Sequence, residues 1–156
     1  MTEVLTAEAG VANGAKPDPE VRRKRDHADR LWSVAAGHRD LAVELEAGGD
    51  PDAFRRAKMQ RLLGEVAAHH GFAYHELANA AEARASAKAL PRESPQWTLL
   101  LDRSFSAIRR AEAHHERAAA YTARTAGNEA AARRHEAAAR EADSRAGAMA
   151  VEARTA

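Results

Sequence analysis

The sequence predicts an all-α fold, an antiparallel bundle of four long helices built as two α-hairpins, with a flexible N-terminal leader. Three observations lead to this prediction. Alanine, the best helix former, supplies most of the 45% hydrophobic fraction. Apolar residues recur in steps of three and four along the chain, which is the period of a helix. Capping residues followed by proline or glutamate mark four helix starts, and glycine or proline separates the helices.

The first hairpin is predicted over residues 18–89. Residues 1–17 lack periodicity, and we expect them to form the leader. Asp18 caps a helix that ends near Ala47, where Gly48-Gly49 stops it. Asp50 caps a second helix that runs to about Ala89 and contains Gly64 and Gly71 in its interior. We expect these glycines to admit a neighbouring helix closely.

The second hairpin is predicted over residues 94–155, after a hinge at 90–93, and the two hairpins form one domain over 18–155. Ser94 caps the third helix, which ends at Ala126-Gly127, and Asn128 caps the fourth. The Gly127-Asn128 turn repeats Gly49-Asp50 at an offset of half the chain. A duplicated hairpin and independent turn chemistry both explain the repeat, and the residues leave both interpretations open.

The helix periodicity also predicts which residues face the core. We expect the larger apolar side chains of each stripe to lie inward, with alanines between them. Among these expected inner residues are Leu31, Val34, Leu41, Phe54, Met59, Leu77, Phe105 and Ile108. Leu, Ile, Val and Phe together number only 22 of 156 residues, so the core is expected to be thin. We therefore expect added stability from pairing, either with another copy or with a protein partner.

Composition excludes several classes of function. The net charge of +1 does not indicate general binding to polyanions. The absence of cysteine excludes disulfides and thiol catalysis. The longest bulky apolar run, Trp97 to Leu101, is too short to cross a bilayer, and the N-terminus lacks a basic signal-peptide region. We therefore expect a cytoplasmic protein without membrane contact.

Histidines are the residues from which a functional site is predicted. Folding at the hinge brings the pair His69-His70 to the level of the pair His114-His115, because Arg92 lies midway between them. The segment Glu112 to His115 has the spacing Glu-x-x-His. Two imidazoles and a carboxylate on facing helices are ligands for zinc or iron. The predicted metal ligands are His70, His115, Glu112, His69 and His114.

The same spacing resembles part of a ferritin-like di-metal site, which uses two Glu-x-x-His motifs and two further glutamates. The second motif is missing, because Glu65 and His69 stand four residues apart. We therefore assign no family. Two other interpretations of the histidines are solvation on the helix surface and pH sensing, in which charged imidazoles repel one another below about pH 6.5.

A second candidate site is the basic run Arg22, Arg23, Lys24 and Arg25 near the start of the first helix. Cations oppose the helix dipole there, so the run could mark contact with nucleic acid or an acidic partner. Asp26 and Asp29 follow directly, however, and no aromatic residue is interleaved for base stacking. The plain alternative is a solvated run that keeps the helix soluble.

The primary functional hypothesis is a non-enzymatic helical interaction or scaffold protein, because no motif requires a reaction. We expect an oligomer, a homodimer above all, that buries the fourth helix or the Trp97 to Leu101 end. The first alternative is a metal-binding bundle that uses the histidines and Glu112 with a divalent ion. The second is a nucleic-acid-associated helical protein that uses Arg22 to Arg25.

Overall fold

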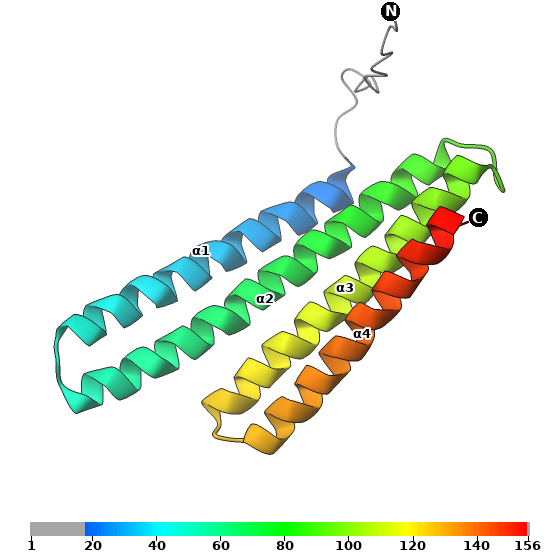
Figure 1. Cartoon of the computed structure of the whole chain (residues 1–156). Helices are drawn as coiled ribbons and strands as arrows, with labels where there is room; N and C mark the ends of the chain where they lie inside the picture. The colour runs from blue at the N-terminus through cyan, green and yellow to red at the C-terminus, as the bar shows by residue number, and fades with distance from the viewer. Residues whose placement is uncertain (1–17, 156) are drawn as a thin grey trace, which may run out of the picture.

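Four long helices make up the described part of the chain, which is residues 18–155 of a computed structural model. They are α1 (Pro19–Ala47), α2 (Pro51–Lys88), α3 (Pro95–Thr125) and α4 (Glu129–Thr155). Successive helices run in opposite directions (Figure 1). The predicted all-α antiparallel bundle of two hairpins is therefore confirmed. The predicted leader, residues 1–17, lies outside the described residues.

Local capping chemistry sets the helix starts. The side chains of Asp18 and Asp50 accept hydrogen bonds from backbone N–H groups of the first turns of α1 and α2. Ser94 Oγ accepts from Trp97 N at 3.2 Å, and Asn128 Oδ1 accepts from Ala131 N at 3.0 Å. All four predicted caps are therefore present.

Glycine allows both tight turns. Gly49 and Gly127 adopt φ values of 69° and 70°, in the left-handed region that residues with a Cβ avoid. The hinge between α2 and α3 is different, because Glu93 has a φ of 65° there and forms the turn without glycine. The matching geometry of Gly49 and Gly127 fits duplication and independent turn chemistry equally well.

The helices are arranged as an open row in the order α1, α2, α3, α4. Each helix packs only against its neighbours along the chain, and within residues 18–155 α1 and α4 do not pack against each other. The inner helices α2 and α3 therefore have two packed sides each, whereas α1 and α4 have one. The row leaves two broad faces, one on either side of the helix layer.

Small residues at seven-residue intervals form the contacts between helices. The buried positions of α1 are Val21, Ala28, Ala35 and Ala42, and those of α4 include Ala132, Ala139 and Ala146. The inner helices carry two such stripes each. On α2 they are Ala57, Gly64, Gly71 and Ala78 toward α1, and Ala73, Ala80 and Ala87 toward α3. On α3 they are Ser104, Ala111 and Ala118 toward α2, and Ser106, Ala113 and Ala120 toward α4. A strict seven-residue repeat is typical of a left-handed supercoil.

The two interior glycines of α2 confirm the expected close approach. A Cβ added to Gly71 would lie 2.6 Å from Cδ1 and Nε1 of Trp32, and one added to Gly64 would lie 3.4 Å from the backbone oxygen of Ala35. The indole of Trp32 therefore occupies the space that a side chain at position 71 would need.

Large apolar residues do not form the core, and this part of the sequence prediction was wrong. Val34, Leu41, Phe54, Met59 and Phe105 are between 39% and 51% exposed. The reason is geometric: alanine and glycine let the helix axes come close, and larger side chains are then displaced to the two faces of the row.

Candidate functional site

Histidine pairs bridge α2 and α3 as the sequence predicts. Nδ1 of His69 lies 3.1 Å from Nδ1 of His114, and Nδ1 of His70 lies 3.3 Å from Nδ1 of His115. When both rings of a pair are neutral, one donates its Nδ1–H to the other ring's Nδ1, so the two rings take opposite tautomers. The antiparallel packing of α2 and α3 about the hinge therefore brings four of the predicted site residues into contact as two separate pairs.

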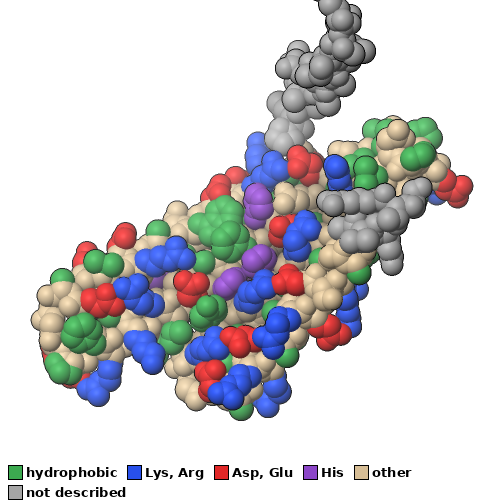
Figure 2. Space-filling model, in the orientation of Figure 1, with side chains coloured by type: hydrophobic (Ala, Val, Ile, Leu, Met, Phe, Trp, Pro, Cys, Tyr) green, Lys and Arg blue, Asp and Glu red, His purple; other side chains and the backbone are tan. Residues whose placement is uncertain are grey.

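The two pairs lie on opposite faces of the row, because adjacent residues on a helix point about 100° apart. Seven arginine–carboxylate ion pairs between neighbouring helices define the face of His69 and His114, which we call the charged face. They are Arg25–Glu82, Arg39–Glu65, Arg61–Glu46, Arg110–Glu76, Arg117–Asp143, Arg124–Glu136 and Arg124–Glu129. Figure 2 shows this face, with charged side chains of both signs around hydrophobic and histidine side chains.

Aromatic rings enclose the His69–His114 pair. Tyr121 stacks on His69 with ring centroids 5.5 Å apart, and Phe72 stacks on His114 at 5.2 Å. Burial and the nearby His114 lower the pKa of His69 to about 4. Burial and the guanidinium of Arg117 lower the pKa of His114. These two imidazoles are therefore neutral at physiological pH.

The His70–His115 pair lies on the opposite face, beside other aromatic and titratable groups. Tyr74 contacts His27 edge-on at a centroid distance of 4.3 Å and approaches His115 at 6.3 Å. Burial, His115 and His27 together lower the pKa of His70. A shallow groove of about 490 Å³ between His70, His115 and His135 opens on this side. His135 itself is bound to Glu116 at 2.7 Å.

The spacing within each pair suits a metal ion, but the predicted carboxylate ligand is missing. Two Zn–N bonds of about 2.0–2.1 Å at a tetrahedral angle place the nitrogens about 3.3 Å apart. Glu112 instead forms an ion pair with Arg109 at 2.7 Å. Over the described residues, no group of three or more His, Asp or Glu side chains gathers as a ligand set. Each pair on its own therefore offers two protein ligands.

The basic run on α1 is divided between ion pairs and solvent. Lys24 Nζ contacts Glu20 at 2.6 Å, and Arg25 contacts Glu82 of α2 at 2.7 Å, while Arg22 and Arg23 are exposed. The structure does not gather the four cations on one surface, because consecutive residues of a helix point in different directions.

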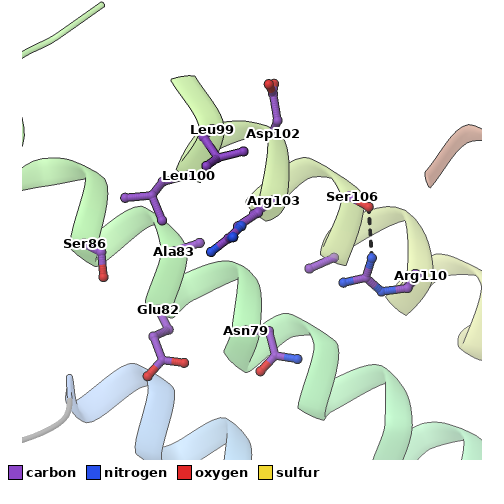
Figure 3. Close-up of a pocket in the computed structure, with 11 residues that line it drawn as sticks. Asn79, Glu82, Ala83, Ser86, Leu99, Leu100, Asp102, Arg103, Ser106 and Arg110 are labelled. Atoms are coloured by element: carbon purple, nitrogen blue, oxygen red, sulfur yellow. Dashed lines mark hydrogen bonds between the residues drawn. The ribbon is translucent and has the colours of Figure 1, made fainter. Parts of the chain in front are cut away.

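A groove of about 700 Å³ with a mixed polar and apolar lining lies between α2 and α3 on the charged face, near the hinge. Figure 3 shows Arg103 extending from α3 toward α2 near Ala83, and Arg110 bonded to Ser106 of its own helix. Arg110 donates to Ser106 Oγ at 2.9 Å and to Glu76 at 3.0 Å. No histidine lines this groove, so its serines have no imidazole base beside them.

The face opposite the ion pairs is a feature that the sequence reasoning missed. Its large side chains come from α1, α2 and α3, and we call it the apolar face. They are Leu31, Val34, Leu41, Leu45, Leu63, Leu77, Leu101, Phe105 and Ile108. Val34 is 50% exposed, Leu41 42% and Phe105 45%. The signal in the sequence was the seven-residue repeat of alanine, which fixes the packed sides and hence the faces.

Comparison with known proteins adds no further information. No protein family, no curated protein and no solved structure matches the chain. None of the helices in the described residues is long and apolar enough to cross a membrane.

Proposed function

We propose that the chain is a non-enzymatic helical interaction protein that docks through its apolar face. A cytoplasmic location and an oligomeric state belong to this proposal. The observation that carries it is the exposure of Val34, Leu41 and Phe105 on one face of an open row of helices. Large exposed apolar side chains on one face mark candidate sites of protein association.

The alanine core supports the same proposal. Burial of a leucine side chain stabilises a fold by about 2 kcal/mol, whereas the methyl group of alanine contributes well under half of that. Apart from Val21, the buried apolar residues of the described chain are alanines. The larger apolar side chains therefore stabilise the structure fully only when a partner covers them.

Site-specific photo-crosslinking in native cells tests this proposal. A photoreactive residue at Val34 should form adducts with a protein, because Val34 lies on the apolar face. The same residue at Val43 is the matched control, since Val43 is 58% exposed on the same helix but points away from that face. Equal adduct formation from both positions, or none from Val34, would contradict the proposal.

Metal binding is a second candidate function, favoured by the 3.1 Å and 3.3 Å separations between paired Nδ1 atoms. Two neutral imidazoles across two helices bind Zn²⁺ with water completing the tetrahedron. The two lowered pKa values on the charged face keep those rings in the neutral form that ligates metal.

Calorimetric titration of untagged protein with Zn²⁺ tests the metal site. We expect the affinity of the His70–His115 pair for Zn²⁺ to fall at least tenfold in His70→Ala. The affinity of the His69–His114 pair should fall by the same factor in His69→Ala. His38→Ala is the control, because His38 pairs with Gln60 at 2.6 Å and contacts no other histidine. Unchanged affinity and unchanged stoichiometry in all three variants would exclude the histidine pairs as ligands.

A further inference from the structure

We infer that the apolar face is covered by a second copy of this chain, so that two rows of helices stack face to face. This inference rests on the proposed function, because it names the partner of the same surface. Four observations lead to it: the size of the face, the polar outer edges of the row, the small net charge, and the placement of ion pairs.

The apolar face is large enough for a stable dimer. A helix of 31 residues such as α3 is about 45 Å long at 1.5 Å per residue. Three neighbouring helices span about 20–30 Å at the usual interaxial distance, which gives a face of roughly 1,000 Å². A standard protein interface buries about 800 Å² on each partner. The face formed by α1, α2 and α3 therefore meets that size without help from α4.

The outer edges of the row do not offer a competing surface. The edge of α1 carries Arg23, Arg30, Gly37 and Glu44 at seven-residue intervals, all exposed. The edge of α4 carries exposed Arg134 and Glu141. Side-by-side addition of further helices to these edges would bury charged side chains, which costs several kcal/mol per charge. Association is therefore directed to the face, where two copies form a closed pair.

Charge favours a copy of the same chain over a strongly charged partner. The net charge of +1 means that two copies repel each other only weakly. Seven interhelix ion pairs lie on the charged face, whereas the described residues of the apolar face hold the His135–Glu116 pair between helices. The apolar face also carries charges of both signs, among them Arg84 over the Phe105 ring and Glu112 paired with Arg109. A second copy meets this face with both signs, whereas a partner of one sign would be repelled as well as attracted. The sequence prediction of a homodimer is kept, but the proposed surface moves from α4 or the Trp97–Leu101 end to this face.

Sedimentation equilibrium of the full chain and of two matched variants tests the inference. Val34→Glu places a carboxylate on the apolar face, and Val43→Glu makes the same change on the same helix away from that face. We expect a dimer whose dissociation constant rises on the order of 100-fold in Val34→Glu, because both copies contribute the charge. Val43→Glu should stay within about threefold of the parent chain.

A second measurement uses the unmodified chain and so does not depend on whether Val34→Glu folds. The melting temperature of the unmodified chain should rise as its concentration increases, since only the folded state associates. A monomer whose melting temperature is independent of concentration would overturn the inference, as would a dimer that resists Val34→Glu. Intramolecular photo-crosslinks from Val34 to residues 1–17 would also overturn it, because the chain itself would then cover the face.

The two proposals fail in different ways. If the purified chain is a monomer but Val34 still forms protein adducts in cells, the homodimer is excluded and the interaction function remains supported. Absence of both self-association and adducts would reject both proposals.

Discussion

Replacement of Gly71 by alanine is a sharp test of how closely α1 and α2 approach. The new Cβ would lie 2.6 Å from two atoms of the Trp32 indole and 3.2 Å from a third. An ordinary contact between carbon atoms is about 3.5–4.0 Å, so the indole must shift by roughly 1 Å. Overpacking of this kind costs about 1–3 kcal/mol, and the better helix propensity of alanine returns about 1 kcal/mol.

Gly37→Ala is the matched control for this change. Gly37 lies in the interior of α1, and nothing lies within 4 Å of a Cβ built there. Only the propensity gain remains, so the control should stabilise the protein by about 1 kcal/mol. Gly71→Ala should therefore be less stable than Gly37→Ala by about 1–3 kcal/mol.

Urea unfolding followed by helical circular dichroism measures both variants, with the protein concentration held constant because association adds to stability. In a Trp32→Ala background, the cost of Gly71→Ala should largely disappear, because the clashing ring is gone. The comparison is between the double variant and Trp32→Ala alone. Equal stabilisation by Gly71→Ala and Gly37→Ala would refute the close approach of the two helices.

Four further predictions concern a titratable histidine, two buried serines and a helix cap. The free energy of unfolding should fall as pH drops from about 6.5 to about 4, because the unfolded chain takes up protons before His69 does in the fold. The expected loss from His69 is about 1–2 kcal/mol after allowance for solvent screening, and urea midpoints that do not change over this range would contradict it. Ser104→Ala should stabilise the fold by about 1 kcal/mol, since its buried Oγ has no hydrogen-bond partner. Ser106→Ala should destabilise it by a similar amount in the same urea assay, because its Oγ donates to the Ala146 carbonyl at 3.1 Å, and the opposite order would argue against this packing. Asn128→Ala removes the cap of α4 and should cost about 1 kcal/mol, with a lower midpoint as the readout and an unchanged one as the contrary result.

Local chemistry explains why the helices could be predicted from the sequence. Each start carries a side chain that accepts a backbone hydrogen bond, and Gly49 and Gly127 can adopt the positive φ that a tight turn needs. The histidine pairing followed from the same local facts. Once the hinge is fixed near Arg92, antiparallel packing places residues equally far from it at the same height.

The arrangement of the helices could not be predicted in the same way. Val34 and Phe105 recur at the helical period of core residues. An argument from periodicity that expects the largest apolar side chains to be buried therefore places both inside the bundle. Contact between helices was instead decided by the smallest side chains, which allow close approach. The spacing of Glu112 from His115 suits a metal ligand, but spacing alone did not show that Glu112 pairs with Arg109 on the same helix.

The distance between α1 and α4 tests the open row of helices most directly. The chain has no cysteine, so cysteines placed at Arg30 and Ala137, both exposed on the outer helices, would carry the only spin labels. Electron-electron distance measurements need dilution with unlabelled protein, so that pairs between copies do not contribute. Three interaxial steps predict a separation above about 30 Å between the labels, whereas a closed bundle with α1 beside α4 would give less than about 20 Å and contradict the open row.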